Sequence, residues 1–203
     1  MREGRQSIKE FRKLFESALV NDDSELLEST AHKLDSCRLL RDRFPEDSFQ
    51  MILDIMGQPQ FVKMKGGWVL LTIFRDNREA LSEQQEDRLL SAMERIYPEF
   101  IDYMGWFTIC ELLGREFGNR QALDTLTRFA EIDAAEPRSF IPHALEHIIR
   151  ENNEQPLVRA SASLLLTLRM DPSKTVRREA RECIVRMARV GIKLSAILRK
   201  QEE

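Results

Sequence analysis

The sequence predicts an all-α protein whose helical hairpins stack into an α-solenoid. Three observations support this prediction: apolar residues recur at helical spacing along most of the chain, strand-like alternation bounded by turns is absent, and similar helix pairs recur about every 38 residues. A two-helix unit cannot bury its apolar face alone, so it needs a neighbouring unit on which to stack. With 203 residues, the chain is long enough to form such a core.

The helical spacing is clearest in the segments 141–149 and 176–187. In each segment, apolar residues fall at i, i+4, i+7 and i+8, which places them on one face of an α-helix. Asp171 and Pro172 precede the second segment. We expect Asp171 to be its N-cap and Pro172 its first helical residue, because these residue types favour those positions.

Residues 1–57 are predicted to form an N-terminal helical cap. Turn-forming residues interrupt the chain at "NDDS" (21–24), "FPED" (44–47) and "GQP" (57–59). The cap would cover the exposed apolar face of the first repeat, as the end of a solenoid requires. Its expected helices are 5–20, 24–43 and 46–56.

Residues 58–203 are predicted to form the repeat body, packed as one continuous domain. "GWVLLTIF" begins at Gly67 and "GWFTICELL" at Gly105, and a second step of the same length leads into "IPHALEHII". The body therefore consists of about three helix pairs and a terminal piece containing "ECIVRMA". The second helices of the pairs are expected at 83–96, 119–132 and 157–170.

Residues 137–190 resemble the HEAT-like α-helical repeats. The pattern Val-Arg-x-x-Ala occurs near a helix start at Val158–Ala162 and again at Val176–Ala180. In that family a turn aspartate precedes the Val-Arg pair; Asp171 stands in that place before the second pair, and Asn153 before the first.

The resemblance implies stacked hairpins with buried valines and Asp-to-Arg contacts that tie successive turns together. It extends over residues 58–136 by period and pattern only. The two Val-Arg pairs, which begin at Val158 and Val176, are separated by only half a repeat. The resemblance therefore leaves open which helices line the concave face.

The composition is that of an ordinary folded protein, with 42% apolar and 32% charged residues. The first residues are charged and lack the apolar core of a secretory signal, and the longest apolar runs are far shorter than a membrane span. Cys37, Cys110 and Cys183 are far apart and have no CxxC spacing, so we expect buried free thiols. Such thiols are typical of a reducing compartment, and we expect a cytoplasmic location.

Positive charge gathers near the C-terminal end. Residues 174–200 include nine Lys or Arg and two Glu, whereas the whole chain carries a net charge of −3, so the remainder is acidic. On a helix that begins near residue 174, the arginines lie opposite the apolar residues. The sequence therefore predicts an anion-recognising surface at this end. Its expected residues are Arg159, Arg177, Arg178, Arg181, Arg186 and Arg189.

We expect the chain to be a non-catalytic binding or adaptor module whose partner is a protein with an acidic surface. The acidic remainder of the chain would repel a long polyanion, so a localised acidic patch fits better than a duplex. The alternative is a nucleic-acid-binding protein. It would bind through the same basic end. A resemblance to the HEAT-like DNA glycosylases, which set aromatic and carboxylate groups over a damaged nucleotide, would add base excision to this alternative. The residues that carry it are Trp68, Trp106, Asp76 and Asp102.

Two further motifs suggest chemistry. "HALEH" has the H-x-x-E-H pattern of zinc proteases, in which His143 and His147 would bind the metal and Glu146 would activate water. "AHKLDSC" resembles the phospho-accepting helix of histidine phosphotransfer domains, with His32 as the phosphate carrier, but Asp35 replaces the lysine that would steady the phosphate. Because both motifs are incomplete, we predict no catalytic residue, no metal site and no cofactor.

Overall fold

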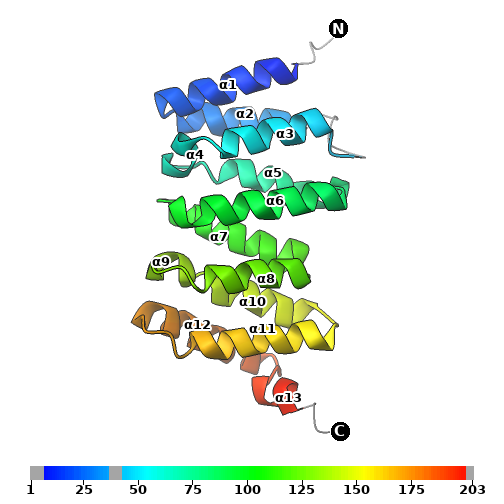
Figure 1. Ribbon diagram of the computed structural model, residues 1–203, viewed down its shortest axis with the longest axis vertical. Coiled ribbons are helices and arrows are strands. Elements are labelled where there is room, and N and C mark those ends of the chain that lie inside the picture. Colours follow the sequence, from blue (N-terminus) through cyan, green and yellow to red (C-terminus); the bar gives the residue numbers. More distant parts are fainter. Residues whose placement is uncertain (1–6, 37–42, 200–203) are drawn as a thin grey trace. The chain divides into compact units, whose positions relative to one another are not determined.

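The computed structural model describes residues 7–36 and 43–199. All regular structure in these ranges is helical, without a β-strand, which confirms the all-α prediction (Figure 1). The chain divides into two compact units, residues 1–108 and 109–203. Helix α7 (Tyr103–Glu111) crosses the point of division.

The first unit consists of helices joined by short turns. Helix α1 packs against α2 and α3, α2 packs against α5, and α3 packs against α6. The expected boundary between an N-terminal cap and a repeat body, after residue 57, stays a prediction. The elements of this unit are α1 (Ile8–Asn21), α2 (Ser24–Ser36), α3 (Glu46–Met56), α4 (Pro59–Lys63), α5 (Val69–Asp76), η2 (Arg78–Ala80), α6 (Glu83–Ile96) and η3 (Tyr97–Glu99).

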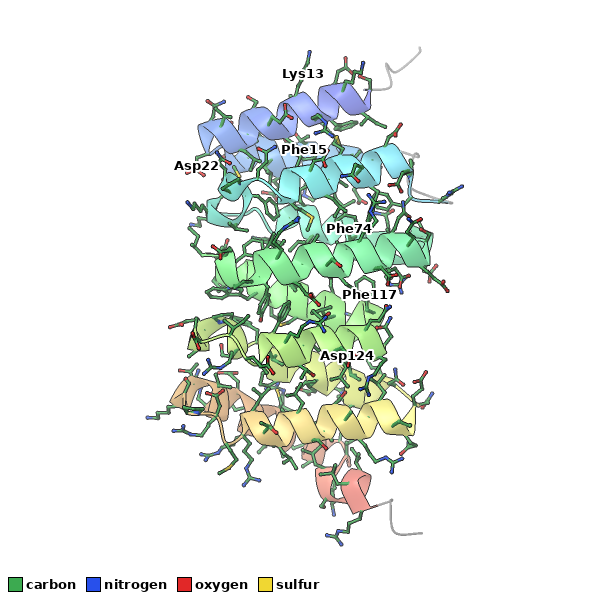
Figure 2. All side chains as sticks on the ribbon, in the orientation of Figure 1. Lys13, Phe15, Asp22, Phe74, Phe117 and Asp124 are labelled. Atoms are coloured by element: carbon green, nitrogen blue, oxygen red, sulfur yellow. The ribbon has the colours of Figure 1, made fainter. Side chains whose placement is uncertain are left out.

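Capping residues and aromatic packing explain these elements. Ser7 precedes α1 and Ser82 precedes α6, and each forms a capping box in which the hydroxyl and the third helical residue exchange hydrogen bonds. Phe44, Phe49 and Phe74 are fully buried, with ring centroids 5.5 to 5.9 Å apart. Figure 2 shows Phe74 among the side chains that fill the space between the ribbons.

The second unit is built around α10. Helix α10 packs against η4, α11 and α12, while α11 also packs against α8 and α13, and α12 against α9. The elements are η4 (Leu112–Phe117), α8 (Arg120–Phe129), α9 (Ala135–Arg138), α10 (Ile141–Glu151), α11 (Gln155–Leu168), α12 (Lys174–Arg189) and α13 (Leu194–Arg199).

The close packing of η4 on α10 depends on Gly114. A Cβ atom at this position would lie 2.5 Å from the carbonyl oxygen of Ala144 and 2.6 Å from its Cα. Both atoms belong to the backbone of α10, so a side chain could be accommodated only by moving one helix. The segment around Gly114 is a π-helix, a form that occurs mostly as a single turn within an α-helix.

The expected second helices match α6, α8 and α11 to within three residues at each end. The expected N-cap of α12 is wrong. Helix α12 begins at Lys174, its N-cap is Ser173, and Pro172 lies before the helix. The Asp171 carboxylate instead accepts a hydrogen bond from the backbone N–H of Ser173 at 2.7 Å. The reason is that a buried arginine, described below, holds this carboxylate.

Cys110 and Cys183 are buried, as expected, and neither belongs to a disulfide among the described residues. Burial raises the pKa of the Cys183 thiol to about 12. Cys37 lies outside the described residues, as do residues 38–42 of the helix that was expected to run to residue 43. Within the described ranges, every helix is too short or too polar to cross a membrane.

A candidate protein-binding face on helix α12

Helix α12 docks in the second unit through its apolar side. Val176, Ala180, Cys183 and Met187 are each at most 1% exposed, at the spacing expected from the sequence. They face α9, α10 and α11, against which α12 packs. One side of the helix is therefore fixed, and its opposite side is presented outward.

The outward side of α12 carries one row of exposed side chains, which we call the α12 row. At 100° per residue, its members lie within about 40° of the direction of Val185. The rise of 1.5 Å per residue gives the row a length of about 22 Å. Its members, all exposed, are Lys174, Arg178, Arg181, Val185 and Arg189.

Arg186 points about 100° away from Val185 and so lies outside this row; it is bound to a buried carboxylate. Its guanidinium donates two hydrogen bonds to Glu146 of α10, at 2.6 and 3.0 Å, and Glu146 is only 4% exposed. Burial by itself would raise the pKa of Glu146, but the hydrogen bond and charge of Arg186 outweigh it, so the pKa is lowered. Arg186 therefore fastens α12 to α10.

Arg177, Arg178 and Arg159 also have partners within the chain. Arg177 donates to the carbonyl oxygens of Asp171 and Pro172, at 2.6 and 2.7 Å, and so holds the turn before α12. Arg178 forms ion pairs along its own helix, at 2.8 and 3.8 Å, with Glu179 and Glu182. Arg159 donates to a backbone carbonyl one turn earlier in α11.

Arg181 and Arg189 are the two predicted residues that remain unengaged. Both are exposed, and neither forms an ion pair or side-chain hydrogen bond with a residue in the described ranges. Lys174, at the start of the α12 row, is also exposed and forms no ion pair or side-chain hydrogen bond with a residue in the described ranges. The six predicted arginines thus divide into structural residues and cations that are available to a partner.

A buried ion pair that the sequence did not identify fixes the start of α12. Arg138 and Asp171 are 8% and 9% exposed, and the guanidinium donates two parallel hydrogen bonds to the carboxylate at 2.9 and 3.0 Å. The remaining amino group of Arg138 donates to the backbone carbonyls of residues 132–134. An Asp-to-Arg contact between turns was expected at Asp171, but nothing in the sequence pattern singled out Arg138 as its partner.

The H-x-x-E-H residues of α10 make contacts within the protein. His143 and His147 meet edge to face with ring centroids 4.8 Å apart, and His147 Nδ1 lies 2.8 Å from the carboxylate of Glu151. Burial lowers the pKa of His143. The carboxylate of Glu146 accepts hydrogen bonds from Arg186 and Arg150, so it is engaged within the protein. Across the described ranges, no three His, Cys, Asp or Glu residues are placed to hold a metal ion.

The aromatic and carboxylate groups of the glycosylase hypothesis have structural partners. Asp102 accepts backbone N–H bonds from Gly66 and Met104, at 3.2 and 3.0 Å. Trp106 is half-buried and donates to the carbonyl oxygen of Tyr97 at 2.9 Å. The Asp102 carboxylate therefore links the turn at Gly66 to the start of α7.

The remaining candidates, Asp76, Trp68 and His32, lie in the first unit. Asp76 pairs with the neighbouring Arg75 at 2.8 Å, and Trp68 is half-buried. His32 is exposed on α2 and lies 3.6 Å from Glu28. Asp35, three residues after the histidine, accepts a hydrogen bond from Asn77, so this carboxylate is held close to α5.

No protein-family model matches the chain, and no curated protein or solved structure matches it significantly. The resemblance to the HEAT-like repeats accordingly stays a prediction from the sequence. Its strongest support is the paired Val-Arg-x-x-Ala pattern at Val158–Ala162 and Val176–Ala180.

Proposed function

We propose that this chain is a non-catalytic binding or adaptor module that presents the basic side of α12 to a protein with an acidic surface. The observation that carries the proposal is the exposure of Lys174, Arg181 and Arg189 on a helix that is anchored along its other side. Cations without an internal counter-charge attract an anionic partner at long range and pair with it on contact.

The proposed scaffold is a HEAT-like stack of helical hairpins. Within the second unit, α10 packs against α11 and η4, and α11 also packs against α8. A stack of this kind holds its surface helices at fixed positions, so partner side chains meet a preformed array. The cytoplasmic location expected from the cysteine pattern stays a prediction.

An acidic protein suits the α12 row better than a nucleic acid. Glu179 and Glu182 lie on the same helix as the free cations, and the chain outside this end is acidic. A duplex carries phosphates along its whole length and would meet these carboxylates. A partner with a local acidic patch can avoid them.

The test compares two double charge reversals that change the net charge equally. Arg181→Glu with Arg189→Glu alters the free cations, and Arg115→Glu with Arg120→Glu alters exposed arginines on η4 and α8. Each protein is immobilised and exposed to native lysate, and the bound proteins are quantified by mass spectrometry. Circular dichroism checks that both variants are folded.

We expect the first variant to lose a specific set of acidic proteins that wild type and the second variant retain. Equal capture by both variants would refute the assignment to α12. A labelled DNA duplex and a labelled RNA duplex are tested in parallel at low salt. Retardation of either duplex that disappears with the first variant would replace the proposal by nucleic-acid binding, since phosphate contacts depend steeply on salt.

A further inference from the structure

We infer that the occupant of the α12 row is an acidic amphipathic α-helix, lying lengthwise along α12 with an apolar residue opposite Val185. This inference rests on the proposed function and specifies the form of the partner. It follows from the spacing of the row, from the hydrogen-bonding groups that the row offers, and from its single apolar member.

The spacing of the row is that of one helix facing another. Successive members are separated by four, three, four and four residues, so they form a nearly straight line along the helix axis. A second helix that carries carboxylates at the same spacing would meet the row along its full length of about 22 Å, which corresponds to about 15 residues. Two helices that pack side by side make contact in this way.

An extended peptide would gain few hydrogen bonds to its backbone from this surface. Extended segments are bound through backbone N–H and C=O groups, which pair with a sheet edge or with amide side chains. The α12 row has only cationic donors and one valine, so it offers no acceptor for a backbone N–H. The described ranges contain no β-strand that could supply an edge. A helix satisfies its own backbone and needs only side-chain contacts.

The apolar contact comes from Val185, which is 48% exposed. Arg181 lies one turn before it and Arg189 one turn after it in the row. Flanking arginines extend apolar stems over the same surface while their charged ends remain at its border. The row therefore has one apolar position, Val185, with an arginine one turn away on each side, which is complementary to a leucine flanked by glutamates.

The carboxylates beside the row restrict how the partner can lie. Glu179 and Glu182 are on one side of the row and pair with Arg178 in the free protein. An acidic partner residue on that side would be repelled, whereas one above Arg181 or Arg189 meets an unengaged cation. Binding thus selects a partner whose acidic stripe is narrow, as it is on one face of an amphipathic helix.

Three fluorescent peptides of about 18 residues test the inference with the full chain. The first is a hydrocarbon-stapled helix with glutamates at the spacing of the row and a leucine at the position that faces Val185. The second has the same sequence except for two prolines near its middle, which prevent helix formation. The third is the stapled helix with the leucine replaced by serine. Dissociation constants are measured by fluorescence anisotropy for wild type, Val185→Ser, and the double reversal at Arg181 and Arg189.

We expect the stapled helix to bind wild type at least about tenfold more tightly than the proline peptide, because the proline peptide must order its chain on binding. Replacing the leucine that faces Val185, or Val185 itself, by serine should weaken binding by about five- to tenfold, as expected for the loss of one apolar contact. The two replacements together should cost less than the product of the separate losses, because they remove the same contact.

The outcomes separate this inference from the proposed function. Equal affinity of the stapled and proline peptides, both weakened by the reversal of Arg181 and Arg189, would overturn the helical partner and leave the acidic partner standing. An affinity that does not respond to Val185→Ser would overturn the apolar contact at Val185. Failure of the stapled and the proline peptide to bind, or binding that is unaffected by the double reversal, would overturn the proposed function as well.

Discussion

The buried pair Arg138–Asp171 makes a quantitative prediction about stability. In Asp171→Asn the guanidinium of Arg138 loses its ionic partner in a site where the two residues are only 8% and 9% exposed. Breaking a buried ion pair costs about 3–5 kcal/mol, because the remaining charge is left without compensation. Arg138 keeps its bonds to the carbonyls of residues 132–134, so we expect a smaller loss of about 2–3 kcal/mol.

The loss is measured by urea unfolding at pH 7, followed by circular dichroism. With a typical slope of about 2 kcal/mol per molar urea, the midpoint should fall by about 1–1.5 M. The matched control is Asp124→Asn. Asp124, labelled in Figure 2, pairs with Arg120 at 3.1 Å, and their side chains are 47% and 68% exposed. An exposed pair of this kind contributes about 0–1 kcal/mol, so the control should change little.

The pH dependence of the loss has a defined direction. Burial alone would raise the pKa of Asp171, but hydrogen bonds from Arg138 and the Ser173 backbone lower it in the folded protein. A carboxyl with a lowered folded pKa stabilises the fold above its unfolded pKa of about 3.9, and this stability is lost as the pH falls through the folded pKa. The gap between wild type and Asp171→Asn should therefore be full at pH 7 and narrow below about pH 4.

Two results would refute this account of the ion pair. The first is a destabilisation no larger than that of Asp124→Asn. The second is a gap between wild type and Asp171→Asn that stays constant from pH 7 to about pH 3, since the ionised carboxylate would then contribute nothing to the difference.

Two further predictions concern packing and reactivity. Gly114→Ala should destabilise the protein by about 1–3 kcal/mol, because the new methyl group meets the backbone of Ala144. The control Gly57→Ala, whose Cβ would make ordinary contacts of 3.4 Å or more, should have a much smaller effect. Equal urea midpoints for the two variants would contradict the packing argument. Cys183 should react with iodoacetamide at pH 8 about a thousandfold more slowly in the native protein than in urea, because burial raises its pKa to about 12 and the thiolate is the reacting form. Peptide mass spectrometry measures labelling at this residue, and comparable rates would show that the thiol is accessible.

The periodicity of the sequence predicted the helices well, because helix formation and one-sided burial are encoded in local spacing. The ends of α6 were predicted to the residue, and the buried side of α12 follows the spacing that began at Val176. The N-cap of α12 was wrong, since the choice between Asp171 and Ser173 depended on an arginine from a different turn. A local pattern does not contain that information.

The candidate surface was predicted only as a set of arginines with a common direction. The helical wheel placed Arg177 and Arg186 among the outward residues, because it treats every position at the same angle alike. The structure removes both from the free set, since long guanidinium stems reach sideways to Glu146 and to the carbonyls of the preceding turn. The helical wheel could have shown that Val185 points in the same direction as the arginines of the row, but a single valine among arginines carries no strong signal.

By itself, the sequence determined that this protein is helical, which side of α12 is buried, and that the C-terminal end is basic. Tertiary structure decided which cations remain available. Arg186 meets a carboxylate 40 residues away and Arg138 one 33 residues away. Such pairings arise when helices pack and desolvate charges together. Local spacing sets the direction of a side chain, whereas its partner depends on which distant segment the fold brings within reach.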